Sequence, residues 1–232
     1  MIRARFAAMA SALLLVTAVA AGPARATDSI PLPGNTTIRA PVTSYFGLRF
    51  KQVVRQNYDI SCGAAALATL LRYYYGMPIS EKEIIEQIFA KSSDDQKKKI
   101  NAYGFSMLEL KHFGESLGFV VGGFRLDGVE KLAKLKVPVL TLITVRGYKH
   151  FVVLKGLYQG QVYIADPAFG NRSRPLERFA HEWDGVVLVM VSDKIAGRND
   201  FSADGSLRAP GEGVLPLIDR YARPITRSPT EF

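Results

Sequence analysis

The sequence predicts an α+β fold in which N-terminal helices pack on an antiparallel sheet. Between residues 61 and 117, apolar side chains recur at helical spacing behind serine caps. From residue 119 onward, the apolar residues instead form short strand-like runs separated by turn residues. Helices followed by strands are typical of the α+β class. The sequence shows no internal repeat and no sign of a second domain.

Three helices are predicted in the first half, beginning at Cys62, Ser80 and Ser106. Ser61 is a favourable N-cap residue for the first helix, and Gly76 ends it. Glutamate follows three residues after Ser80 and after Ser106, which is the capping-box spacing. The charged segment 91–104 is expected to be a loop.

The second half is expected to supply the sheet. Strands are predicted over 119–124, 137–145, 150–157, 161–166 and 186–191, with short helices at 129–135 and 176–183. The runs 150–157 and 161–166 are close enough in sequence to form a hairpin.

The first 26 residues have the layout of a secretory signal peptide. Arg3 and Arg5 precede an apolar stretch over residues 6–21, and Ala24-Arg25-Ala26 supplies the small residues of a cleavage site. The stretch is shorter than the about 20 apolar residues of a typical transmembrane helix. We therefore expect cleavage after Ala26, no membrane span afterwards and a periplasmic protein.

Four segments follow from these patterns: a signal peptide (1–26), an extended, irregular lead-in (27–50), one folded domain (51–192) and a loosely held, basic C-terminal tail containing Pro and Gly (193–232). Cleavage removes three arginines and no acidic residue, so the net charge falls from +9 to +6. The charges are dispersed and no nucleic-acid-binding motif accompanies them, so no nucleic-acid partner is expected.

Cys62 is the only cysteine of the chain. Exported proteins commonly pair cysteines in disulfides, and a single thiol cannot form an internal one. A buried inert thiol and an intermolecular disulfide are the alternatives to a reactive role. The predicted helix start favours reactivity, because a helix N-terminus stabilises a thiolate and lowers a cysteine pKa from about 8.5 toward roughly 3.5–7.5.

The chain has three histidines that could act as the base. His112 is expected to be exposed near the start of the third helix, and His181 to lie in the short helix 176–183. His150 begins a strongly apolar strand, and a strand end holds a side chain rigidly. His150 is therefore the preferred base.

Asp166 ends the next strand, where it could orient His150. A two-residue turn at Gln159-Gly160 would place it opposite Val153, on the face away from His150. A three-residue loop with a left-handed Gly160 would place it opposite Val152, diagonal to His150 and within side-chain reach. We predict the three-residue loop; the alternative for Asp166 is a turn residue before a proline.

Gln56 lies six residues before Cys62 and can return to the same site through the intervening loop. A side-chain amide there could donate to the oxyanion formed during acyl transfer, together with the Cys62 backbone N–H. The alternative is an ordinary surface glutamine.

Taken together, the segments 56–67, 147–153 and 162–167 resemble the Gln, Cys-Gly, His and Asp-Pro motifs of the bacteriocin-processing peptidases that cleave double-glycine leaders. The similarity runs from about residue 52 to residue 191. It implies a papain-like fold with Cys62 as nucleophile, His150 as base, Asp166 orienting the base and Gln56 completing the oxyanion hole. It also implies cleavage after Gly-Gly without a metal or organic cofactor.

Two departures from that family are visible. Ser61 stands where family members commonly carry an acidic residue, and the sequence contains no Walker A motif of a fused ABC exporter. The chain is more similar to free-standing exported members, including the periplasmic peptidase-like component of functional-amyloid secretion systems. Any secretion system or ABC exporter acting with it would be encoded separately.

The sequence thus predicts a cysteine peptidase acting on a secreted or leader-bearing protein through a Cys62 thioester. A non-hydrolytic leader-binding accessory protein is the alternative from another class. A third possibility keeps the same site but performs another acyl transfer, such as amide formation.

Overall fold

The computed structural model describes residues 27–32, 36–41, 44–198 and 201, so the expected signal peptide lies outside the described residues. The chain divides into two units at Ser44. In the first, strand β1 (Thr27–Leu32) pairs antiparallel with β2 (Thr36–Pro41). The expectation of an irregular segment is therefore wrong for these residues.

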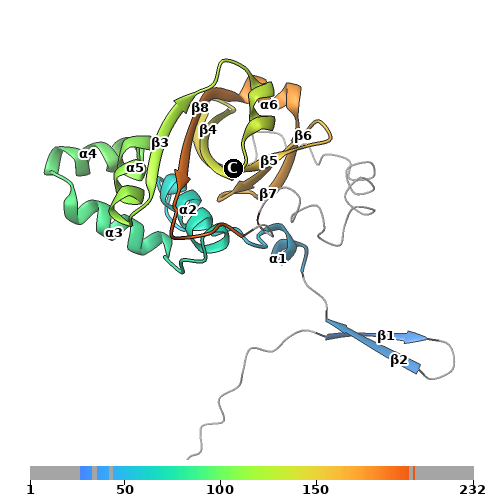
Figure 1. Ribbon diagram of the computed structural model, residues 1–232. Coiled ribbons are helices and arrows are strands. Elements are labelled where there is room, and N and C mark those ends of the chain that lie inside the picture. The colour runs from blue at the N-terminus through green and yellow to red at the C-terminus, as the bar shows by residue number, and fades with distance from the viewer. Residues whose placement is uncertain (1–26, 33–35, 42–43, 199–200, 202–232) are drawn as a thin grey trace, which may run out of the picture. The chain divides into compact units, whose positions relative to one another are not determined.

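The second unit begins with helices and continues as a sheet, which confirms the α+β prediction (Figure 1). The helices of its first half are α1 (Tyr45–Arg49), α2 (Cys62–Thr69), the π-helix η1 (Leu70–Tyr74), α3 (Glu81–Lys91), α4 (Asp94–Tyr103) and α5 (Met107–Ser116). The second half contains β3 (Val120–Arg125), the 3₁₀-helix η2 (Val129–Lys134), β4 (Val139–Val145), β5 (Tyr148–Tyr158), β6 (Gln161–Asp166), β7 (Gly170–Pro175), α6 (Leu176–Glu182) and β8 (Trp183–Val191).

The six strands β3 to β8 form one antiparallel sheet in the order β3-β8-β4-β5-β6-β7. Strand β8, the last in sequence, lies between β3 and β4, whereas β4 to β7 follow one another as neighbours. Figure 1 shows the sheet curving around α6, with α2 on its other side. The strands β5 and β6 that carry His150 and Asp166 are adjacent in the interior of the sheet.

The alternating side chains of β5 divide the core into two parts. Phe151 and Val153 pack in a cluster with the apolar faces of α2, α3 and α5. Val152 and Leu154 belong to a second cluster that includes Phe179 of α6 and a leucine of η2. Because successive strand residues point to opposite faces, an apolar run like this one is buried on both sides.

Serine caps begin α3, α4 and α5, as predicted for α3 and α5. Ser80 and Ser106 form capping boxes at the starts of α3 and α5. Segment 91–104, expected as a loop, instead contains α4, which begins with a third capping box at Ser93. Only Ile100 of α4 is buried, so its sequence lacks the apolar stripe by which a helix is recognised.

The beginning of the expected C-terminal tail packs against the domain. The Arg198 backbone N–H donates to the Tyr74 carbonyl oxygen at 2.8 Å, and Phe201 is fully buried near the rings of Tyr73 and Tyr74. The expectation of a loose tail is therefore wrong for these residues. Residues beyond Phe201 lie outside the described part of the chain.

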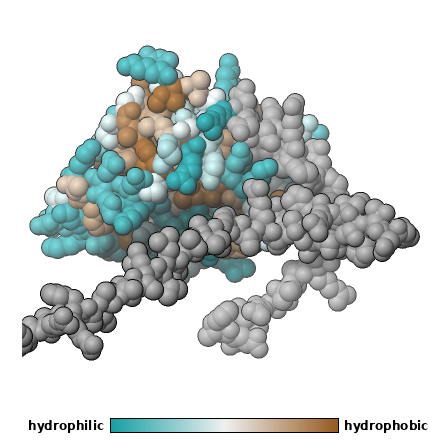
Figure 2. All heavy atoms as spheres, turned by 90° about the horizontal axis from the view of Figure 1, so that it is seen from below, coloured by the Kyte–Doolittle hydropathy of each residue, from teal (hydrophilic) through white to brown (hydrophobic). Residues whose placement is uncertain are grey.

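Seen from below in Figure 2, hydrophobic side chains of the described residues occur as separate groups between hydrophilic ones. Among the described residues, no helix combines the length and the apolar character needed to cross a membrane.

Candidate active site

Cys62 is the first residue of α2, as predicted, and its side chain is half-buried. Burial by itself would raise the pKa of the thiol. Hydrogen bonds with His150 and with the backbone of Phe151 and Gly63, together with the charge of His150, outweigh that effect and lower the pKa. The site therefore favours the thiolate, which is the nucleophilic form of cysteine.

His150 lies in β5 between the thiol and a carboxylate. Its Nε2 is 2.8 Å from Asp166 Oδ1, and its other side is hydrogen-bonded to Cys62. Burial alone would lower the pKa of the imidazole, but the hydrogen bonds and negative charges of Asp166 and Cys62 raise it to about 9. The lowered thiol pKa and the raised imidazole pKa both favour an imidazolium–thiolate pair.

Asp166 ends β6, and its side chain is 1% exposed. Burial would raise the pKa of this carboxyl, but the hydrogen bond and charge of His150, the Phe169 amide and the charge of Arg172 lower it. Oδ1 also accepts the Ala168 and Phe169 amides at 2.9 and 3.0 Å, and Arg172 Nη1 lies 3.0 Å from Oδ2. Four donors therefore hold the carboxylate ionised and oriented.

The register that joins His150 and Asp166 does not arise from the predicted three-residue loop. Tyr158 pairs with Gln161, so the turn has two residues, and both Gln159 and Gly160 have positive φ. The register instead shifts between Leu154 and Gly156, and Val153 then pairs with Ala165. A β-bulge at Lys155 supplies the one-residue shift that we had assigned to the turn.

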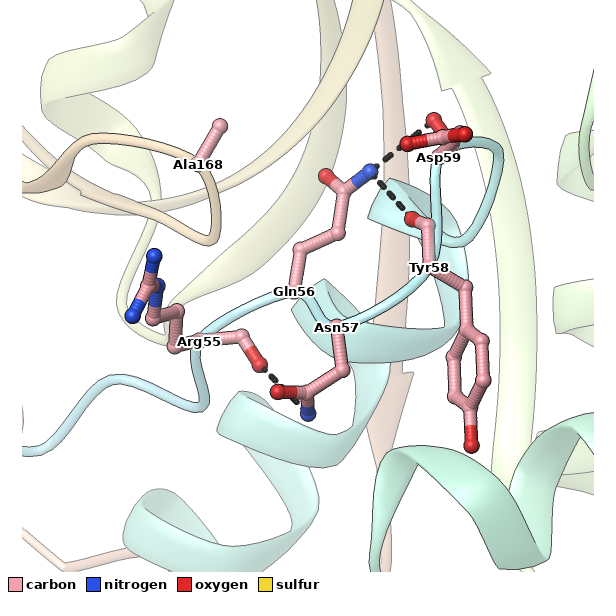
Figure 3. A pocket seen from close by; sticks show the side chains of 6 residues that line it. All are labelled: Arg55, Gln56, Asn57, Tyr58, Asp59 and Ala168. Carbon is pink, nitrogen blue, oxygen red and sulfur yellow. Dashed lines mark hydrogen bonds between the residues drawn. The ribbon is translucent and has the colours of Figure 1, made fainter.

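Gln56 lies beside the site, where its backbone N–H donates to the Pro167 carbonyl oxygen at 3.0 Å. Its side-chain Nε2 donates to the Tyr58 and Asp59 carbonyl oxygens at 2.6 and 3.0 Å, as Figure 3 shows. Both amide hydrogens are thus engaged within the loop 57–61. The surrounding polar pocket of about 230 Å³ is lined by Arg55, Gln56, Asn57, Tyr58, Asp59 and Ala168.

Ser61 occupies the N-cap position of α2 but does not cap it with its side chain. Its hydroxyl donates to Glu81 Oε1 and also lies 2.8 Å from the Tyr58 carbonyl oxygen. The expected side-chain cap is therefore wrong, because the neighbouring carboxylate of α3 binds the hydroxyl in another direction.

His112 and His181 are exposed, and the site brings neither of them to Cys62. Sequence reasoning missed two charged residues. Arg172 contacts Asp166, and Glu81 accepts the hydrogen bond of the Ser61 hydroxyl. Arg172 lies in β7, a strand of polar residues that was not predicted, and its guanidinium stacks over the Phe169 ring at 4.9 Å. Residues 171–174 are all polar, so the sequence carries no apolar alternation that would have indicated this strand. Within the described residues, no group of three or more His, Cys, Asp or Glu side chains could hold a metal ion.

Residues 50–195 match the peptidase C39 family. The probable functional amyloid protease FapD of Pseudomonas aeruginosa is 39% identical over 160 residues, which cover 69% of each chain. The protein of the same name from Pseudomonas fluorescens is 36% identical over 187 residues, covering 80% of this chain and 81% of that one.

Among solved structures, the peptidase domain of Streptococcus ComA, a bifunctional ABC transporter, matches with a TM-score of 0.50 and 23% identity. The match covers 61% of this chain and 98% of that domain. This likeness confirms the predicted papain-like fold.

Proposed function

Because the chain belongs to the peptidase C39 family and is a cysteine peptidase, we propose that it is exported and cleaves a secreted or leader-bearing protein through a Cys62 thioester. The observation that carries this proposal is the hydrogen-bonded series from Cys62 through His150 to Asp166. A thiolate, a protonated base beside it and an orienting carboxylate are the groups that acyl transfer to cysteine requires.

In this mechanism the Cys62 thiolate attacks the scissile carbonyl carbon, and the carbonyl electron pair moves to oxygen. Since Nε2 of His150 faces Asp166, Nδ1 is the nitrogen left to face Cys62. The imidazolium gives its proton to the leaving amine as the thioester forms. The imidazole then takes a proton from water, which attacks the thioester and releases the acid and the thiolate. Asp166 stays ionised throughout.

The oxyanion would be held by the Cys62 backbone N–H and the side chain of Gln56. Both Nε2 hydrogens of Gln56 are bonded to carbonyl oxygens of the loop 57–61 before substrate binds. We propose that one of these bonds is exchanged for the oxyanion, which is a stronger acceptor than a neutral carbonyl because it carries charge.

The substrate proposal follows from the relatives. The two FapD proteins are named probable functional amyloid proteases. We propose that this chain acts in the periplasm on a protein of a functional-amyloid secretion system, after removal of residues 1–26. Cleavage after a Gly-Gly pair is the specificity that the family resemblance implies for such a substrate.

A non-hydrolytic leader-binding protein is the second candidate, and one observation favours it. With both Gln56 amide hydrogens engaged, the oxyanion hole lacks a free side-chain donor. The lowered thiol pKa of Cys62 beside His150 favours the peptidase, because binding alone does not require a lowered thiol pKa.

The test is cleavage of a purified candidate amyloid protein carrying a Gly-Gly site, followed by mass spectrometry of the products. The wild-type chain should release defined fragments, and Cys62→Ala should release none. His150→Ala should be equally inactive, whereas the exposed His181→Ala serves as its matched control. Undiminished cleavage by Cys62→Ala would contradict the proposed mechanism. If a thiol-reactive peptidyl inhibitor labels Cys62 of the wild type no faster than it labels an ordinary thiol, the leader-binding protein is supported instead.

A further inference from the structure

Glu81 is a buried carboxylate that the mechanism above does not use. It is the first residue of α3 and is 3% exposed. The Asn57 backbone N–H lies 3.2 and 3.1 Å from its two oxygens, Asn57 Nδ2 donates to Oε2 at 2.8 Å, and the Ser61 hydroxyl donates to Oε1. Three uncharged donors from one loop therefore converge on it.

Capping of α3 does not account for this arrangement. Ser80 is the N-cap residue of α3 and forms a capping box with Glu83. The positive end of the helix dipole favours an acid in the first turn, but an exposed side chain obtains that benefit without burial. Burying a carboxylate is costly unless hydrogen bonds compensate, and here every compensating bond comes from the loop 57–61.

That loop connects Gln56 and Cys62, the two residues proposed to donate hydrogen bonds to the oxyanion. Ser61 immediately precedes Cys62, so its position sets the direction of the Cys62 backbone N–H. The carbonyl oxygens of Tyr58 and Asp59 accept the two hydrogen bonds of the Gln56 amide. Glu81 holds both ends of the loop, at Asn57 and at Ser61, and thereby fixes the carbonyls between them.

We propose that Glu81 is a positioning residue for the oxyanion hole, acting through the loop 57–61 on Gln56 and the Cys62 N–H. This rests on the peptidase mechanism proposed above. Glu81 itself contacts no reacting atom. Its carboxylate is needed because each of its oxygens must accept, and an amide in its place would present hydrogen atoms to the Asn57 donors.

The test compares Glu81→Gln with Glu86→Gln, a change of the same kind on an exposed glutamate of α3. We expect Glu81→Gln to lower kcat at least about tenfold, as loss of a hydrogen bond to a charged group commonly does. KM should stay within about twofold, since ground-state binding is retained. Glu86→Gln should match the wild type.

Two further measurements separate positioning from general damage. A peptidyl aldehyde forms a tetrahedral adduct that uses the oxyanion hole, so its affinity for Glu81→Gln should fall by about the same factor as kcat. Iodoacetamide alkylation of Cys62 needs no oxyanion hole, and its rate and pH profile should be unchanged. If alkylation falls in parallel with kcat, the role of Glu81 is merely structural and the proposal is wrong.

Ser61→Ala decides the matter if Glu81→Gln does not fold. It removes the Ser61 hydroxyl, one of the three donors to Glu81. The aldehyde affinity should again decrease, by a smaller factor, while the alkylation rate of Cys62 stays unchanged. If the wild type cleaves peptide and both variants equal it, the positioning role fails while the peptidase mechanism stands. If the wild type neither cleaves peptide nor binds the aldehyde, both proposals fail.

Discussion

Replacing Asp166 with asparagine tests the charge network on which the site depends. The change keeps the size of the side chain and removes its charge. His150 Nε2 and Arg172 Nη1 would then face a neutral group, and the Ala168 and Phe169 amides would lose a charged acceptor. We expect a loss of both stability and activity from the same substitution.

The magnitude follows from burial and the number of donors. Asp166 is 1% exposed, and breaking a buried charged pair costs about 3–5 kcal/mol. A chain of this length loses about 2–4 °C in Tm per kcal/mol, which gives a decrease of about 6–20 °C. His150 would lose one of the two anions that raise its pKa to about 9, and general acid–base catalysis contributes about 10²–10⁴ in rate. We therefore expect kcat/KM to decrease by a factor of about 10²–10⁴.

Thermal unfolding monitored by circular dichroism and peptide cleavage would measure the two effects. Asp95→Asn on α4 is the matched control, because that carboxylate is 87% exposed and lies 3.6 Å from Lys98. Its Tm and kcat/KM should equal the wild-type values. A Tm for Asp166→Asn within 2 °C of the wild type, with undiminished kcat/KM, would refute the network described here.

Further predictions concern the pH dependence of the same groups. Iodoacetamide should alkylate Cys62 of the wild type at lower pH than Cys62 of His150→Ala, because the variant lacks the hydrogen bond and the charge of His150 that lower the thiol pKa. Equal pH profiles would contradict the ion pair. The raised pKa of His150 contributes stability that is complete below about pH 6.5 and is lost as the pH rises through about 9, so Tm should decrease over that interval by more than in His150→Ala. Arg172→Gln removes a cation that lowers the pKa of Asp166, so the acidic limb of kcat/KM should move to higher pH, while the exposed Arg178→Gln leaves it in place.

The sequence predicts the helices and strands that have an apolar pattern and misses those that lack one. Helices α3 and α5 combine capping boxes with buried apolar faces, and both were predicted. Helix α4 has the same capping box, at Ser93 and Gln96, but only one buried side chain. Strand β7 lies at the edge of the sheet, and its residues 171–174 are all polar. Helix α4 is supported by its capping box and β7 by pairing with β6, and neither has the apolar pattern from which an element is predicted.

Cys62, His150 and Asp166 could be grouped from the sequence because each stands at or near the end of a strongly patterned element; the structure begins β5 two residues before His150. Their register could not be derived from turn length alone. The bulge at Lys155 shifts the pairing, and Gly156, with φ of 154°, adopts a backbone conformation that other residues rarely use. An isolated glycine inside an apolar strand is a known signal of a bulge. Reading Gly156 in that way would have given the correct register with a two-residue turn.

Arg172 and Glu81 were missed for a different reason. Each is a charged residue in a polar stretch of sequence, where solvent exposure is the ordinary expectation. Only the fold shows that Asp166 is 1% exposed and that Glu81 is 3% exposed. A buried carboxylate requires donors, so its burial determines which residues must surround it. The residues that orient a cysteine nucleophile and its base are therefore recognised by asking what satisfies each buried charge, a question that only the three-dimensional structure answers.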